Sequence, residues 1–368
     1  MNYSVLVALL LCWLLAGCTP KSEPILIGLA VNLTGTGGTA GEYIREGAML
    51  AVEEVNRRGG VNGRPLKLLV RDDKNSAEGI RQADQELMQE GVVAIIGHSY
   101  SDSTLQAYPQ VMANGKTLLI TGYTATDKLT GRDDLFFRTS VSSSSYSAAT
   151  VRLLNRRGIR SITLLQDRAN FSFSEEIAAG VRQRFDGAVS VVTTDSRGEV
   201  NWDSVVRQIQ RQKPGAVFLL TEVATSGIAA QKLQSAGYQG DLLATLWAQT
   251  PDLIRFGGTA VEGLTILTFI EPDNPRPAYR AFAATIEKRF SKAATARTDR
   301  AYELITILAE ALGRAPAHTA AELKAALLRE PFETLMGTVR FDRFGDVERP
   351  IFEVRVADGR FANGGEIK

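Results

Sequence analysis

The chain has 368 residues, of which 44% are hydrophobic and 23% charged, enough apolar material for one large domain or two medium ones. Its 42 Lys and Arg against 41 Asp and Glu give a formal net charge of +1. This composition excludes a disordered chain and a coiled coil, and it implies no basic surface for a nucleic acid.

The N-terminus carries an unbroken apolar run at residues 5–16. A run of this length is typical of a signal-peptide core and is short of the roughly 20 residues that span a bilayer. It ends in Leu15-Ala16-Gly17-Cys18, which resembles the bacterial lipoprotein signal, in which the cysteine becomes the acylated N-terminus. We predict a lipoprotein signal peptide at 1–17, a lipid anchor at Cys18 and a tether at 18–24. The alternative is a buried N-terminal helix with a core cysteine.

The loss of Cys12 with the signal would leave the mature domain without a pair of thiols for a disulfide. There is likewise no cysteine-based metal site, and His98 and His318 are far apart in the sequence. We therefore expect a mature domain stabilised by packing alone. The predicted signal places it outside the cytoplasm, in the periplasm or at the cell surface.

From residue 25 onward, apolar strand patterns alternate with amphipathic helical patterns, as in a parallel α/β sheet. The first unit has predicted strands at 25–31, 66–70, 92–96, 117–120 and 135–139, and predicted helices at 42–57, 76–90 and 103–113. A glycine-rich loop at 32–41 joins the first strand to the first helix. These residues predict one α/β domain.

The same alternation begins again after a helix predicted at 146–156. The second unit has predicted strands at 161–165, 189–192, 216–220, 242–246 and 263–268, and predicted helices at 173–184, 202–212 and 225–236. After a break at 273–277 come helices at 278–289, 299–312 and 320–328 and a last strand at 351–356. Helices that follow a complete second domain indicate that the chain returns to the first.

Two strands of the first unit end in loops of glycine and hydroxyl residues. Residues 97–104 follow one strand and residues 121–126 follow the next. Their small side chains leave backbone N–H groups free at the start of a helix, where an anion can bind. Because ligands bind outside the carboxyl ends of parallel strands, we expect both loops to face one pocket.

An ordered series of motifs resembles the periplasmic substrate-binding proteins of the leucine/isoleucine/valine type. The most specific stretches are 47–56, 59–63, 72–73, 96–104, 137–139 and 341–346. The resemblance covers residues 25–356 and implies the type I periplasmic binding fold, an α/β fold in which two Rossmann-like lobes with parallel sheets are joined by three hinge crossovers. The implied lobes are 25–139 with 268–338, and 140–267 with 339–368.

The resemblance also implies roles for particular residues. In amino-acid binders of this family, a Ser after the Gly-His strand end and a Gly-x-Thr after the next strand hold the ligand carboxylate; these match Ser101, Gly122 and Thr124. A hydroxyl and backbone N–H groups can satisfy a carboxylate without a cation. The alternative is that these residues are only turn and N-cap residues.

The second lobe departs from the family pattern. Phe171 replaces the tyrosine that covers the ligand, and Leu246 stands where an acid would bind the ligand's ammonium. Glu222 could supply that charge from a neighbouring strand end; otherwise the ligand would be a carboxylate, amide or aromatic compound. Four aromatic residues could form apolar walls or simply pack between the lobes: Tyr100, Tyr123, Phe171 and Trp247.

Two enzyme hypotheses are weaker. The stretch 35–40 approximates a dinucleotide fingerprint, but its candidate ribose ligands, Glu53 and Glu54, lie within the first helix rather than at the end of the second strand. Ser99 as a hydrolase nucleophile would need glycine where Ser101 stands. Neither enzyme class fits its own motif.

We therefore predict the lipid-anchored, extracytoplasmic solute-binding component of an ABC importer. Its expected partners are a small carboxylate-bearing ligand such as an amino acid, an ABC transporter permease, and a membrane through Cys18. We expect no catalytic residue, cofactor, metal or nucleic acid. A ligand-sensing receptor module of the same fold is the alternative that no sequence feature excludes.

Overall fold

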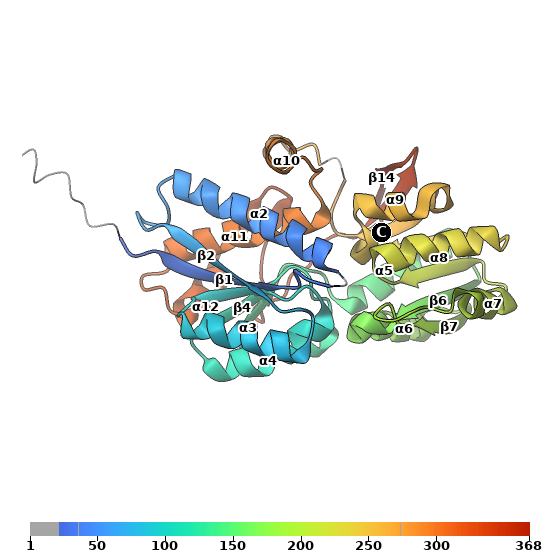
Figure 1. Ribbon diagram of the computed structural model, residues 1–368, viewed down its shortest axis with the longest axis horizontal. Coiled ribbons are helices and arrows are strands. Elements are labelled where there is room, and N and C mark those ends of the chain that lie inside the picture. Colours follow the sequence, from blue (N-terminus) through green and yellow to red (C-terminus); the bar gives the residue numbers. More distant parts are fainter. Residues whose placement is uncertain (1–21, 36, 273) are drawn as a thin grey trace, which may run out of the picture.

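The computed structural model describes residues 22–35, 37–272 and 274–368, which form two α/β lobes side by side (Figure 1). The predicted signal peptide and Cys18 lie outside these residues. Within the described ranges, no helix is both long and apolar enough to cross a membrane. The expected two-lobed α/β fold is confirmed.

Lobe 1 contains a five-stranded sheet in the order β2-β1-β3-β4-β5, with every neighbouring pair parallel. The strands are β1 (Ile25–Val31), β2 (Leu66–Asp72), β3 (Ala94–Gly97), β4 (Leu118–Thr121) and β5 (Phe136–Arg138). The register pairs Ile27 with Leu68 on one side and with Ala94 on the other. The strand order reverses between β1 and β3, which is where an open α/β sheet binds ligands.

Helices cover both faces of this sheet, so its strands are apolar on both sides. The helices are α2 (Gly38–Arg57), α3 (Ala77–Gln89), α4 (Ser101–Asn114), α10 (Pro277–Phe290), α11 (Ala296–Arg314) and α12 (Ala320–Arg329). Ile27 and Leu29 belong to the core cluster that contains α2, α11 and α12, whereas Ala30 and Ile95 belong to the cluster that contains α3 and α4. The late helices α10 to α12 therefore return to lobe 1, as the sequence predicts.

Lobe 2 contains a seven-stranded sheet in the order β14-β13-β10-β9-β8-β6-β7. Its strands are β6 (Ser161–Asp167), β7 (Ala188–Thr194), β8 (Ala216–Leu220), β9 (Asp241–Thr245), β10 (Thr265–Thr268), β13 (Phe352–Ala357) and β14 (Arg360–Glu366). Its helices are α5 (Ser143–Arg156), α6 (Phe171–Arg184), α7 (Trp202–Gln212), α8 (Val223–Ser235) and α9 (Pro251–Gly257). The pairs up to β10 are parallel, but the hairpin β13–β14 joins the sheet antiparallel. The sequence analysis missed α9 and β14.

The chain crosses between the lobes after β5, after β10 and before β13. A small hairpin, β11 (Phe332–Thr334) and β12 (Gly337–Val339), still belongs to lobe 1. Phe341 bridges to Val347 and packs in the core of lobe 1. The last crossing therefore follows Val347, whereas the predicted boundary lies after residue 338. The Arg138 guanidinium, which is buried, forms an ion pair of 2.7 Å with Asp346 and ties the first crossing to the last.

Candidate functional site

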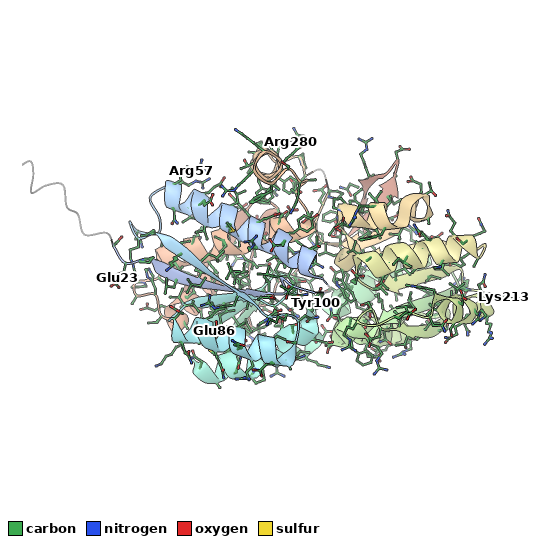
Figure 2. The ribbon with its side chains drawn as sticks, in the orientation of Figure 1. Glu23, Arg57, Glu86, Tyr100, Lys213 and Arg280 are labelled. Atoms are coloured by element: carbon green, nitrogen blue, oxygen red, sulfur yellow. The ribbon has the colours of Figure 1, made fainter. Side chains whose placement is uncertain are left out.

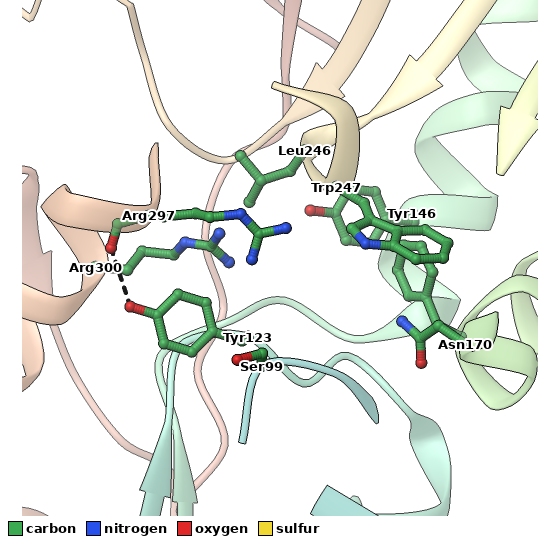
Figure 3. A pocket seen from close by; sticks show the side chains of 9 residues that line it. Ser99, Tyr123, Tyr146, Asn170, Leu246, Trp247, Arg297 and Arg300 are labelled. Atoms are coloured by element: carbon green, nitrogen blue, oxygen red, sulfur yellow. Dashed lines mark hydrogen bonds between the residues drawn. The ribbon is translucent and has the colours of Figure 1, made fainter. Parts of the chain in front are cut away.

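A small cavity lies where the two lobes meet (Figure 3). It is lined by Ser99, Tyr123, Tyr146, Asn170, Phe173, Leu246, Trp247, Arg297 and Arg300. Its volume of about 30 Å³ is enough for a water molecule or two. The strand-end loops of the two lobes lie close together around this cavity. A second, larger cavity of about 1050 Å³ is also lined by residues of both lobes, from α9, α10, the start of α11 and the β13–β14 turn.

Both lobes contribute to the cavity wall through the ends of their strands. In lobe 1, Ser99 follows β3 and Tyr123 follows β4; in lobe 2, Asn170 follows β6 and Trp247 follows β9. The strand-end loops of both sheets therefore face one pocket, as the glycine- and hydroxyl-rich loops predict. Tyr100 also lies at this boundary between the lobes (Figure 2).

Aromatic rings form the lobe 2 side of the cavity. Phe173 packs edge-to-face against Tyr146 and Trp247, with ring centroids 5.9 Å and 5.8 Å away. The Nε1 of Trp247 is buried and has no hydrogen-bond acceptor among the described residues. This wall offers a flat apolar surface with one unused donor.

Two arginines form the lobe 1 side, and both come from the first two turns of α11. Thr295 caps the helix, since its Oγ1 accepts from the backbone N–H groups of Arg297 and Thr298. The hydroxyl of Tyr123 donates to the carbonyl of Arg297 at 3.0 Å (Figure 3). These contacts fix the start of the helix, which carries Arg297 and Arg300 beside the cleft.

The two guanidinium groups differ in their partners. Arg300 donates from Nε to Ala296 and from Nη1 to Gly122, each at 2.7 Å, and stacks on the ring of Tyr123. The Arg297 side chain makes no hydrogen bond or ion pair with the part of the chain that the structure describes, although the residue is only 5% exposed. Figure 3 shows its guanidinium reaching across the cavity toward Tyr146. Arg297 is the available cation of the site.

The positive charge of α11 has little compensation. Among the described residues that line the cavity, none is acidic. Burial raises the pKa of Asp299 to about 7, so this carboxyl is only partly ionised at neutral pH. Glu303 already pairs with Arg349 at 2.7 Å. Burial, with Arg297 nearby, lowers the pKa of Arg300 to about 10, so Arg300 stays charged at neutral pH.

Of the predicted ligand-binding residues, Tyr123 and Trp247 line the cavity. Ser101 and Thr124 lie behind the wall with no exposed surface. The Ser101 hydroxyl accepts from the N–H of Ala125 at 3.2 Å, and the Thr124 hydroxyl contacts that of Thr104. These hydroxyls hold the two loops of lobe 1 together.

The remaining predicted residues surround the cavity without lining it. The carbonyl of Gly122 accepts from Arg300. The ring of Tyr100 packs edge-to-face against that of Trp247, with the ring centroids 6.1 Å apart. Phe171 is 45% exposed at the surface, because a step of two residues along the first turn of α6 is about 200° around the helix, so that Phe173 faces the cavity instead. Glu222 caps α8, and its two carboxylate oxygens accept from the N–H groups of residues 224 and 225.

The histidine of the hydrolase hypothesis is engaged away from Ser99, which lines the cavity. His98 Nδ1 lies 2.7 Å from Asp73, and its Nε2 lies 3.2 Å from Asp84, all three residues being buried. Burial opposes the charged ring, but the carboxylates of Asp84 and Asp73 prevail and raise the pKa of His98 to about 10. A protonated imidazole held by two carboxylates cannot act as a base for Ser99.

The candidate ribose ligands of the dinucleotide hypothesis also have other partners. Glu53 forms an ion pair with Arg289, and Glu54 accepts from the hydroxyl of Tyr302, so both acids are engaged with late helices of lobe 1. Over the described ranges, no cluster of three or more His, Cys, Asp or Glu side chains could hold a metal ion. These contacts leave the interlobe cavity as the candidate site.

The sequence analysis missed Tyr146, Asn170, Phe173, Arg297 and Arg300. The first turn of α11 carries both Arg297 and Asp299, so its charges offered no local signal for a ligand-binding arginine.

Comparisons with known proteins agree with this architecture. The profile of the family described as periplasmic binding protein matches residues 24–361. The leucine-, isoleucine-, valine-, threonine- and alanine-binding protein of Pseudomonas aeruginosa is 24% identical over 346 residues, covering 92% of this chain and 91% of the relative.

Solved structures show the same fold. A leucine-binding protein of Thermotoga maritima has a TM-score of 0.85 at 21% identity, covering 94% of this chain and 99% of its own. An ABC transporter solute-binding protein of R. palustris, in complex with benzoate, has a TM-score of 0.84 at 19% identity, covering 94% and 96%. With the family profile spanning nearly the whole chain, the protein belongs to the periplasmic binding protein family, whose members are solute-binding proteins rather than enzymes.

Proposed function

We propose that this protein is the extracytoplasmic solute-binding component of an ABC importer and that it closes its lobes around a small carboxylate-bearing ligand. One observation carries the proposal. A cavity between the lobes has, on one side, the guanidinium of Arg297, which pairs with no described residue, and on the other side aromatic rings. Closure around a ligand couples occupancy to the shape that a membrane partner can recognise.

The relatives support a ligand of this size and charge. The protein of Pseudomonas aeruginosa is named for aliphatic amino acids, and that of R. palustris is described with benzoate. Both ligand types carry a carboxylate. Amino acids, aromatic acids and amides are therefore the compounds to screen.

The test combines binding with uptake. Compounds that bind only the folded protein raise its melting temperature, and small-angle X-ray scattering should then show a change in particle dimensions as the lobes rearrange around the ligand. A strain lacking the protein should take up the identified compound more slowly, and the full chain should restore uptake. Unchanged uptake, with ligand binding intact, would overturn the importer assignment and point to a sensor.

The membrane anchor is a separate proposal. We infer that Cys18 is acylated, because an apolar run ends in small residues directly before it. Mass spectrometry of the mature N-terminal peptide should find a lipid-modified cysteine, and Cys18→Ser should move the protein from the membrane fraction to the soluble one. An unmodified, soluble wild-type protein would refute the anchor.

A further inference from the structure

The described residues that line the interlobe cavity include two cations and no acid, and the nearby carboxylate of Glu222, which interacts with Tyr100, is engaged in capping α8. This distribution of charge bears on the class of ligand. We propose that the ligand is an anion without an ammonium group, whose carboxylate binds the guanidinium of Arg297 and whose apolar body packs on the aromatic wall of lobe 2. The inference rests on the proposed solute-binding function and narrows it to one charge type.

Arg297 is built as an anion-binding group. Its backbone is held on both sides, by the cap of Thr295 and by the hydroxyl of Tyr123, while its side chain is left without a described partner. A guanidinium offers two parallel N–H donors that match a carboxylate. Because this residue is only 5% exposed, an anion that pairs with it compensates for water contacts that the guanidinium has lost.

Arg300 reinforces the selection for negative charge. Its Nε and Nη1 are occupied by backbone carbonyls, which neutralise none of its charge. Arg300 and Arg297 line the same small cavity. Any ligand inside therefore experiences the field of two cations in a poorly hydrated site.

The hydroxyl groups behind the cavity are buried and take part in contacts between the loops of lobe 1. The Ser101 oxygen accepts from Ala125, although its own O–H has no acceptor among the described residues, and the Thr124 hydroxyl contacts that of Thr104. A carboxylate could reach them only by breaking contacts between the loops of lobe 1. The guanidinium of Arg297 needs no such rearrangement.

An ammonium group would find no carboxylate in this cavity. Both oxygens of Glu222 hold the N-terminus of α8. Asp167 is fully buried outside the cavity lining, and burial raises its pKa. Asp102 accepts from the backbone N–H groups of residues 171 and 172. A zwitterionic amino acid would instead bring its ammonium toward Arg297 and Arg300.

The other side of the cavity suits an apolar body. Leu246 lines the cavity together with Tyr146, Phe173 and Trp247, and none of these four side chains is charged. The unpaired Nε1 of Trp247 can donate a further hydrogen bond to a ligand oxygen. The ligand thus carries its charge at one end and its hydrophobic surface at the other.

The test uses two matched triplets that differ only in charge. One contains 3-phenylpropanoate, phenylalanine and 3-phenylpropanamide; the other contains 4-methylpentanoate, leucine and 4-methylpentanamide. Isothermal titration calorimetry with the full mature protein should give, in at least one triplet, an acid that binds at least about 10-fold more tightly than its amide and its amino acid.

Variants of one residue then assign the carboxylate. Arg297→Gln should raise the Kd of the acid by about 10- to 100-fold and leave the Kd of the amide nearly unchanged. Arg297→Lys keeps the charge but loses the planar pair of donors, so its Kd for the acid should lie between that of the wild type and that of Arg297→Gln. Arg207→Gln is the control: it removes an exposed arginine of α7 and should change neither the Kd of the acid nor the Kd of the amide. Circular dichroism checks that each variant is folded.

The outcomes separate the two proposals. If leucine or phenylalanine binds as tightly as its acid, or if Arg297→Gln binds the acid normally, the charge assignment is overturned while solute binding stands. If no compound of either triplet binds, both the charge class and the proposed carboxylate ligand fail.

Discussion

His98 and Arg297 are two buried cations of lobe 1 with opposite surroundings. His98 lies between the carboxylates of Asp73 and Asp84. Arg297 has no ion pair with any described residue, yet both side chains are almost entirely shielded from solvent. The protein thus balances one charge internally and leaves the other open toward the cleft.

The difference separates a structural charge from a functional one. A buried charge with internal partners fixes the loops that carry it. Removing one member of such a group leaves the remaining charges buried without a counter-charge. A buried charge without a partner costs stability in the empty protein and gains its partner on binding. Variants at the two sites should therefore have opposite effects on folding and on ligand affinity.

The largest effect should come from breaking the internally paired charge. His98→Leu leaves the carboxylates of Asp73 and Asp84 buried without a cation, so the free energy of unfolding should fall by about 3–5 kcal/mol. Urea unfolding followed by circular dichroism measures this. His318→Leu is the control, because that histidine is only half-buried and should cost about 1 kcal/mol or less. A small loss of stability for His98→Leu would mean that the ion pairs of His98 with Asp73 and Asp84 do not stabilise the fold.

Asp299 tests whether α11 supplies its own counter-charge. Its native pKa of about 7 lies above the ordinary value of 3.8, so the folded protein holds a proton that the unfolded chain releases. Its contribution to stability is fully present below pH 3.8 and is lost as the pH rises toward 7. Asp299→Asn should flatten that part of the pH profile in urea titrations. An unaltered profile would mean an ionised Asp299 that balances the arginines.

Glu222 is a charged residue of lobe 2 that we expect to be structural, like His98. Because its carboxylate caps α8, Glu222→Ala should lower the free energy of unfolding by about 0.5–2 kcal/mol. The ratio of Kd values for leucine and 4-methylpentanoate should stay the same. A selective loss of leucine binding would show instead that Glu222 binds an ammonium.

The smallest effect on folding should come from the open charge. Arg297→Gln removes a buried cation without a described ion-pair partner, so the free energy of unfolding should change by less than about 1 kcal/mol or rise. Urea unfolding without ligand measures this. A loss as large as that expected for His98→Leu would mean that Arg297 is structural.

The sequence by itself determined the two α/β lobes and most of their elements. Strand and helix patterns depend on local periodicity, so β1 and α12 begin at the predicted residues and the late helices return to lobe 1. The loops after β3 and β4 were also predicted to face the pocket, because sheet topology alone puts the ends of adjacent parallel strands together.

Only the tertiary structure decided which side chains line the cavity. Arg297 lies 174 positions from Tyr123 in the chain, and no local pattern reveals that α11 directs its first turn into the cleft. The choice of Phe173 over Phe171 depends on where α6 begins, a difference of two residues that moves one ring to the surface and the other into the cavity. Periodicity identifies a helix, but the packing of distant elements determines which of its residues meet a ligand.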